Sequence, residues 1–249
     1  MKFRTRYVLY WALHVVMFVI GVALVKSDSQ LLVSVGESLI AGGIAGFVIF
    51  WYVLETERVG SLLEALQDFG LQKIHATRGV PIRQEYDAAI AKASDSMDIL
   101  GFGLRSLLED YESSFGSWAA RAKIRVLLLD PEFPSARSSL AEQRDREENN
   151  QKGDIGRDVR EFVRRTSPLV SRGDGRFQVR LYRCLPSVNI FRIDGVLFWG
   201  PYLVGSQSRN MPTLVVKKGG ALFTVFEGQF EAIWSSNEFS RGVPAEWLK

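Results

Sequence analysis

The sequence predicts a two-helix transmembrane hairpin followed by a soluble α/β domain with a mixed sheet. Two long apolar runs, separated by a short polar break, fill the first 54 residues of the 249-residue chain. Beyond residue 80, amphipathic helical patterns alternate with short apolar runs that are typical of strands. Helix–strand units come first and neighbouring strands later, an order that predicts parallel and antiparallel pairs in one sheet.

The first apolar run covers residues 7–25 and contains one histidine, His14, and no Asp, Glu, Lys or Arg. As a helix it is roughly 28 Å long, close to the ~30 Å hydrocarbon core of a bilayer. The second run covers residues 31–54, contains only the charge of Glu37, and is long enough to cross with some tilt. A cleaved signal peptide fits poorly, because no small-x-small site follows Val25 and a second span comes directly after it.

Flanking charges predict the orientation of the hairpin. Basic residues cluster before the first span, only Lys26 lies in the break, and Arg58 follows the second span. The positive-inside rule therefore predicts two spans in the inner (plasma) membrane with both termini cytoplasmic. The cations before the first span are Lys2, Arg4 and Arg6, and the aromatic residues expected at the inner interface are Tyr7, Tyr10, Trp11, Trp51 and Tyr52.

Small and charged residues suggest that the membrane segment does more than anchor. Gly42 and Gly46 form a G-x-x-x-G pair, which permits close helix packing either within one hairpin or between subunits. Glu37 and His14 are costly in hydrocarbon and should face protein or water. Ser34, Glu37 and Ala41 share a helical face that could line a wet pathway between subunits. Alternatively, Glu37 snorkels to the outer surface or bonds a neighbouring backbone group.

Three parts are predicted along the chain: the hairpin at residues 1–54, a helical stalk or linker at 55–80, and a cytoplasmic α/β domain at 81–249. The stalk helix is expected to continue to Ile74 and to be broken at Gly79-Val80-Pro81. Helices are predicted at residues 84–94, 104–122, 135–148, 157–166 and 222–234. Strands are predicted at residues 97–102, 123–129, 177–183, 187–193, 196–204 and 213–217.

The charge distribution and the small number of Cys and His residues limit the kinds of ligand and catalysis to be expected. Between Arg121 and Lys218 the basic residues outnumber the acidic ones by 19 to 11, although the whole chain carries only +3. This stretch suits an anionic partner, and a solvated surface of interspersed ion pairs explains the count equally well. Cys184 is the only cysteine, which suits a reducing compartment. Because His14 and His75 are the only histidines and no Gly-rich phosphate loop is present, we expect no metal, no cofactor and no standard catalytic group.

The order of elements from Glu85 to Trp234 resembles one repeat of the phospholipase D superfamily. The helix at residues 85–94, followed by Asp98-Ile99-Leu100-Gly101, is similar to that family's opening, and residues 122–131 are similar to its second strand. Residues 177–182 and then 188–200 are similar to the strands around its H-x-K-x-x-x-x-D motif. The resemblance covers about 150 residues.

The motif itself is degenerate. If Asp194 takes the place of the motif aspartate, Ser187 stands at the nucleophilic His and Asn189 at the phosphate-binding Lys. The family's chemistry should then be lost, because Ser187 has no visible base and Asn189 has no charge. Residues 189–194, Met211-Pro212 and residues 230–234 are also similar to a degenerate branch found in bacterial regulatory proteins, which implies a sensor.

The resemblance implies a cleft that binds phosphodiesters without cleaving them. Polar contacts are expected from five residues, and two aromatic rings are available to stack on a base. Alternatively, Arg192 pairs with Asp194 or Glu231, and Trp199 belongs to the core. The predicted ligand-binding residues are Arg192, Arg209, Asn189, Gln207, Ser206, Tyr202 and Trp199.

The favoured hypothesis is a homo-oligomeric membrane effector, a dimer or tetramer, whose cytoplasmic domain senses a nucleotide or a single-stranded oligonucleotide. A ligand-gated pore is its candidate output, and bacterial anti-phage defence with a partner nucleotidyltransferase is its setting by family analogy. Two rivals remain: a membrane-bound phosphodiesterase or phospholipase with a non-standard site, and a membrane scaffold or adaptor.

Overall fold

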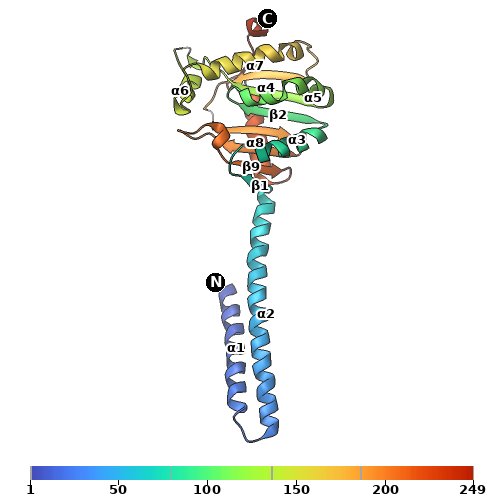
Figure 1. The fold of residues 1–249 in the computed structure, drawn as a ribbon, viewed down its shortest axis with the longest axis vertical. Coiled ribbons are helices and arrows are strands. Elements are labelled where there is room, and N and C mark those ends of the chain that lie inside the picture. Colours follow the sequence, from blue (N-terminus) through green and yellow to red (C-terminus); the bar gives the residue numbers. More distant parts are fainter. Residues whose placement is uncertain (1, 79, 136, 186, 249) are drawn as a thin grey trace. The chain divides into compact units, whose positions relative to one another are not determined.

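The computed structural model describes residues 2–78, 80–135, 137–185 and 187–248 (Figure 1). The chain divides into two compact units, Met1–Ala65 and Leu66–Lys249. The side chains of Lys2, Arg4, Arg6 and Arg58 lie outside the described part, as does Gly79, so the orientation of the hairpin stays a prediction.

The first unit is a helical hairpin, as the sequence predicts. It consists of α1 (Lys2–Leu24) and the first part of α2 (Gln30–Phe69). The two backbones meet near the turn, where a Cβ added to Gly21 would lie 2.8 Å from the carbonyl oxygen of Gly36. Among the described residues, one helical segment is long and apolar enough to cross a membrane, Gln30–Thr56, and a shorter apolar segment covers Val8–Leu24.

The predicted end of the stalk helix is wrong. Helix α2 ends at Phe69, and residues Leu71–His75 form strand β1, which pairs with β9 (Thr213–Lys217). Gly70 makes this switch possible. Its φ of 71° is left-handed, and a Cβ there would lie 2.8 Å from the Cα of Gly220, so only glycine fits. Ile74 therefore belongs to an edge strand rather than to a helical stripe.

The second unit is built on one large mixed sheet, which confirms the predicted fold class at this level. Its order is β1-β9-β8-β7-β2-β3-β6-β10. Strands β2, β3 and β6 run parallel, and every other neighbouring pair is antiparallel. The bounds are β2 Ser96–Gly101, β3 Lys123–Leu129, β6 Phe177–Tyr182, β7 Val188–Ile193, β8 Val196–Pro201, β9 Thr213–Lys217 and β10 Ser240–Gly242.

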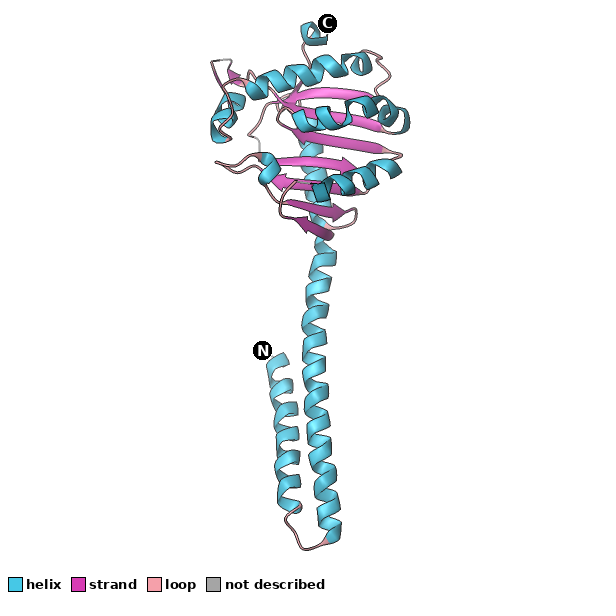
Figure 2. Cartoon of the chain, in the orientation of Figure 1, coloured by secondary structure: helices cyan, strands magenta, loops and turns pink. Residues whose placement is uncertain are grey.

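Helices cover both faces of this sheet (Figures 1 and 2). On one face Tyr86 packs against Phe198, and on the other Phe226 packs against Trp199 at 4.2 Å between ring centroids. The first face carries α3 (Val80–Lys92), α4 (Arg105–Tyr111), α5 (Phe115–Arg121) and α7 (Asp154–Val170), and the second carries α8 (Ala221–Ser235). We call them the α3 face and the α8 face.

Short elements complete the second unit and correct two predicted helices. The helix expected at 104–122 is interrupted by the turn η1 (Glu112–Ser114). The helix expected at 135–148 is only α6 (Leu140–Glu147), because Pro134–Ser135 (β4) and Ser138–Ser139 (β5) form a small hairpin before it. Ser139 caps α6 by accepting the backbone N–H of Glu142. The remaining turns are η2 (Ser208–Asn210) and η3 (Ala245–Leu248).

Candidate functional site

The predicted ligand residues do not line one cleft, because strand alternation sends them to opposite faces of the sheet. Arg192 and Trp199 point to the α8 face, where they meet Glu227 and Phe226. Asn189 lies three positions before Arg192 on β7. Because side chains alternate between the two faces along a strand, Asn189 points to the α3 face. The eight-stranded sheet separates the two groups.

Arg192 is committed to a buried ion-pair network. It is 8% exposed and donates through Nε to Oδ2 of Asp98 at 2.7 Å. Asp98, 1% exposed, also accepts two bonds from Arg125, at 2.7 and 2.9 Å. Asp98 faces Arg125 on β3 and Arg192 on β7 in register, so the three form one row across the central strands.

Two glutamates on α8 complete this ion-pair network. Glu231 pairs with Arg125, and Glu227 lies 3.7 Å from Arg192. Hydrogen bonds from Arg125 hold the pKa of Glu231 below its ordinary value. The guanidinium of Arg125 also lies over the Phe230 ring at 5.0 Å. The sequence prediction offered Asp194 or Glu231 as partners of Arg192. Its carboxylate partners are Asp98 and Glu227, and Asp194 contributes only a backbone carbonyl at 3.3 Å.

The predicted residues on the α3 face are also occupied. Asn189 is 8% exposed, and its Nδ2 donates to the carbonyl of Gly200 at 2.7 Å. Tyr202 stacks on Phe102 with ring centroids 3.8 Å apart, and burial raises the pKa of Tyr202 to about 12. The carbonyl of Ser206 accepts from Arg144 at 3.2 Å. These contacts serve to hold the loop after β8 in place.

Arg144 is the centre of that loop's support. It is 3% exposed, bonds Glu147 and Glu148, and donates to the carbonyl of Leu203 at 2.9 Å. Of the predicted set, Arg209 on η2 is an exposed cation that has no ion pair among the described residues, and Gln207 occupies the N-cap position of the same turn without a side-chain capping bond. Arg209 therefore remains available to a ligand.

Cations without carboxylate partners gather at the opposite end of the sheet. We call the end at which the parallel strands β2, β3 and β6 begin the strand-start end. Strand β8 begins here and β9 ends here, since Val196 pairs with Lys217. Seven exposed basic residues lie here and form no ion pair within the described part of the chain: Lys92, Arg121, Lys123, Arg172, Arg176, Lys217 and Lys218.

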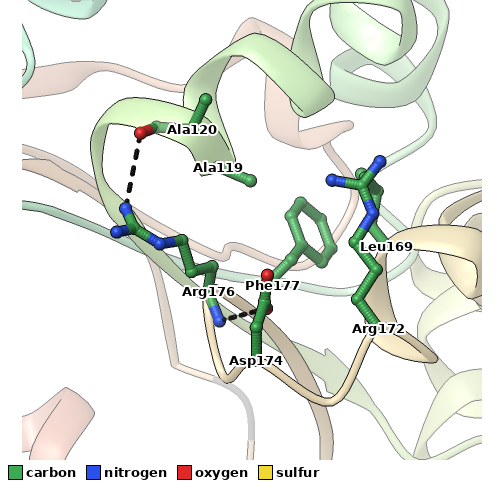
Figure 3. A pocket seen from close by; sticks show the side chains of 7 residues that line it. All are labelled: Ala119, Ala120, Leu169, Arg172, Asp174, Arg176 and Phe177. Atoms are coloured by element: carbon green, nitrogen blue, oxygen red, sulfur yellow. Dashed lines mark hydrogen bonds between the residues drawn. The ribbon is translucent and has the colours of Figure 1, made fainter.

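Two adjoining cavities open at the strand-start end. The first, of about 330 Å³, is lined by Ala119, Ala120, Leu169, Arg172, Asp174, Arg176 and Phe177 (Figure 3). The second, of about 560 Å³, is lined by Ser94, Asp95, Arg121, Lys123, Asp174, Gly175, Arg176 and Gln178. Their volumes fall in the range of small-molecule sites. Asp174 and Arg176 belong to both.

The cations around these cavities are held loosely. Arg176 donates through Nη1 to the carbonyl of Ala120 at 3.4 Å (Figure 3), and Arg121 makes two contacts to carbonyls, also at 3.4 Å. Bonds this long are weak, and among the described residues neither guanidinium forms an ion pair with Asp95 or Asp174, the carboxylates that line the same cavities. The strand-start end can therefore accept an anion without first breaking an ion pair.

Asp194 fixes the backbone beside the second cavity. It adopts φ of 47° just after β7, and its carboxylate accepts the backbone N–H groups of Ser94 at 3.0 Å, Asp95 at 3.1 Å and Ser96 at 2.8 Å. Burial alone would raise the pKa of Asp194, but these three donors and Arg192 bring it below its ordinary value. The residue that the resemblance places at the motif aspartate thus organises the start of β2.

A chain of backbone contacts leads from Asp194 to the end of α2. The carbonyl of the next residue, Gly195, accepts the N–H of Lys218 at 2.8 Å. In the same turn Gly220 packs against Gly70, the first residue after α2, whose carbonyl accepts the N–H of Lys217 at 2.9 Å. Three backbone contacts, Gly195–Lys218, Gly70–Gly220 and Gly70–Lys217, therefore join the residue after Asp194 to the residue after α2.

Sequence reasoning missed the strand-start end, although a signal existed. Arg121 and Lys123 border the start of β3, and Arg176 directly precedes β6. Parallel strands begin at the same end of a sheet, so basic residues before successive strands must gather. The predicted contacts instead lie on and after β7, around the degenerate motif.

The predicted membrane residues divide into packed and exposed ones. Gly46 faces α1, where an added Cβ would overlap the His14 ring, whereas Gly42 meets only the methyl end of Met17, at 3.5 Å. His14 bonds the carbonyl of Tyr10 at 2.8 Å. Glu37 is exposed on the hairpin, like Ser34 and Ala41, and forms no hydrogen bond through its side chain and no ion pair among the described residues. Gly46 is thus used within the hairpin, while Glu37 faces away from it.

Fold and site together define an α/β domain with a mixed eight-stranded sheet that follows an apolar helical hairpin. Residues 71–241 match the family described as a domain of unknown function, DUF5919, and the chain belongs to that family. No match was found among curated proteins.

Two solved structures are similar at low identity. TrmBL2, an archaeal chromatin protein with a novel mode of DNA binding, is 14% identical with a TM-score of 0.45 over 84% of this chain and 69% of its own. A phosphatidylserine synthase of Haemophilus influenzae Rd KW20 is 8% identical with a TM-score of 0.43 over 68% of this chain and 38% of its own.

Proposed function

We propose that the protein is a homo-oligomeric membrane effector whose soluble domain, a degenerate phospholipase D-like domain, senses a nucleotide or short oligonucleotide. The observation that carries this proposal is the group of seven cations at the strand-start end that form no ion pair among the described residues, four of which, Arg121, Lys123, Arg172 and Arg176, line two adjoining cavities. Phosphate groups bind such clusters through charge-assisted hydrogen bonds. The ligand site therefore lies at the strand-start end and not around Arg192.

The contacts from Asp194 to Gly70 support a sensing role. A ligand that moves Ser94 and Asp95 also moves Asp194, whose carboxylate accepts their N–H groups. The contacts of Gly195, Lys218 and Gly220 then transmit this movement to the last turn of α2. A ligand acts on the membrane segment only if it binds two states of this connection unequally. Because these contacts are short and are made by the backbone, a movement of Asp194 should move the end of α2 as well.

The exposed carboxylate of Glu37 supports oligomerisation of the membrane segment. An ionised group facing lipid is costly, so Glu37 is better placed between subunits, where it can line a wet pathway. A ligand-gated pore in the plasma membrane, working in anti-phage defence with a nucleotidyltransferase, is the setting we propose.

An enzymatic function is the rival proposal. Asn189, at the position of the motif lysine, has its amide committed to Gly200 and carries no charge. Turnover of a model phosphodiester such as bis(p-nitrophenyl) phosphate by the purified full chain, abolished by Ser187→Ala, would favour a phosphodiesterase over a sensor. A scaffold, in contrast, would bind neither phosphodiesters nor nucleotides.

The sensor is tested by salt-dependent binding of a fluorescent single-stranded hexanucleotide to the full chain in nanodiscs of zwitterionic lipid. The variant Arg121→Gln/Lys123→Gln/Arg176→Gln removes three cations from the cavities. If each contacts a phosphate, affinity falls at least about thirtyfold, and the slope of log K against log salt decreases by about 2, near 0.7 for each contact.

A charge-matched control separates this site from a general charge effect. Arg105→Gln/Arg146→Gln/Lys152→Gln removes three exposed cations elsewhere and should change affinity by less than threefold. Equal losses in the two triple variants would reduce the binding to non-specific attraction and refute a site at the strand-start end.

A further inference from the structure

The two cavities at the strand-start end offer different chemistry. The first has an apolar floor formed by Ala119, Leu169 and Phe177. Figure 3 shows the Phe177 ring between the side chains of Arg172 and Arg176. The second cavity has no apolar side chain in its lining and carries Arg121 and Lys123 instead. One ligand with a flat apolar part and an anionic part would fill both.

Asp174 and Arg176, which line both cavities, indicate which part of the ligand each cavity would bind. The backbone N–H of Arg176 donates to Oδ1 of Asp174 at 2.9 Å (Figure 3). The other oxygen, Oδ2, accepts no hydrogen bond within the described part of the chain. Asp174 thus offers a carboxylate oxygen as a hydrogen-bond acceptor in the lining of the first cavity. The C-terminal end of the 17-residue helix α7 is close in sequence, and the negative end of its dipole also favours a hydrogen-bond donor from the ligand here.

We infer that the first cavity takes the base of a nucleotide and the second its phosphate, and that Asp174 selects bases with an exocyclic amino group. This inference rests on the proposed function and names the ligand class for the same site. The guanidinium of Arg172, without an ion pair, covers the base opposite the cavity floor. Arg176, between the cavities, and Arg121 and Lys123 hold the phosphate.

Cytosine and uracil provide the matched comparison. They have nearly the same size, and cytosine has an amino group where uracil has a carbonyl. A carboxylate accepts from the cytosine amino group. The ring N–H of uracil is flanked by two carbonyl oxygens, which the Asp174 carboxylate repels. The structure therefore favours cytidine over uridine at this site, independently of stacking strength.

The test measures binding of 5′-phosphorylated C3 and U3 trinucleotides to the full chain in zwitterionic nanodiscs, by titration calorimetry. We expect C3 to bind at least tenfold tighter than U3. Asp174→Asn, which can still accept the N–H of Arg176, should reduce this preference to threefold or less. Ala120→Trp should fill the first cavity and weaken C3 binding about tenfold, whereas the control Ala120→Ser should not.

Inorganic tripolyphosphate separates the failure of this inference from that of the proposed function. Its binding should depend on Arg121 and Lys123 and remain within twofold of wild type in Ala120→Trp. If tripolyphosphate and both trinucleotides bind with equal affinity, the cavity for the base is refuted while the anion site stands. If none of the three binds, the proposed function itself is overturned.

Discussion

Removing the charge of Asp98 tests whether the buried row on the α8 face holds the domain together. Asp98→Asn keeps the shape of the side chain but leaves Arg125 and Arg192, whose side chains are 13% and 10% exposed, without their shared carboxylate. Breaking a buried ion pair by removing one partner costs about 3–5 kcal/mol. Each arginine retains a glutamate of α8, so we expect the lower end, about 3 kcal/mol.

The assay is thermal unfolding of the full chain in detergent, followed by near-UV circular dichroism. For a unit of this size, about 3 kcal/mol lowers Tm by roughly 6–12 °C. The matched control is Asp110→Asn, which breaks the exposed 3.1 Å pair with Arg83 and should shift Tm by less than about 3 °C. A Tm of Asp98→Asn within 2 °C of wild type would show that the network adds nothing to stability and would refute this reasoning.

Three further predictions concern pH and the membrane segment. Burial would raise the pKa of Asp130, but hydrogen bonds from Arg241 and Arg183 outweigh burial and lower this pKa. The ionised Asp130 therefore stabilises the folded state fully above the unfolded pKa of ~3.9, and this contribution is lost as pH falls below that value. Denaturant unfolding should thus give a constant difference between wild type and Asp130→Asn from pH 7 to 5 and a smaller one below pH 4; an unchanged difference contradicts the assignment. Gly46→Leu should separate the two helices, seen as lost cross-linking between cysteines introduced into α1 and α2, whereas Gly42→Leu should keep it. Glu37→Ala should preserve assembly on native gels and reduce cation flux from liposomes, and equal flux would leave the hairpin a plain anchor.

Reporter fusions test the orientation of the hairpin, which is predicted from the flanking charges alone. A reporter after Lys249 should be cytoplasmic and one at Asp28 should lie outside. A periplasmic C-terminus would remove the cytoplasmic nucleotide from consideration.

Sequence periodicity was sufficient for the elements that are long or strongly patterned. The hairpin followed from two apolar runs, and strands such as residues 123–129 and 213–217 were predicted with the bounds that the structure shows. The end of α2 could not be predicted, because the apolar stripe continues past Phe69. Only the contact between Gly70 and Gly220, which are 150 positions apart, turns the chain into β1.

The sequence by itself determined that this chain pairs an apolar hairpin with a mixed α/β sheet, since apolar length and periodicity are local properties. Only the tertiary structure decided which charges are free. Arg192 looked available but is neutralised by Asp98, a residue 94 positions away, across a strand pairing that no local pattern specifies. Arg121 and Arg176 looked ordinary, yet the parallel pairing of β3 with β6 brings the two strand starts together. A cation is available to a ligand only when the fold gives it no ion pair with a carboxylate, and that depends on contacts distant in sequence.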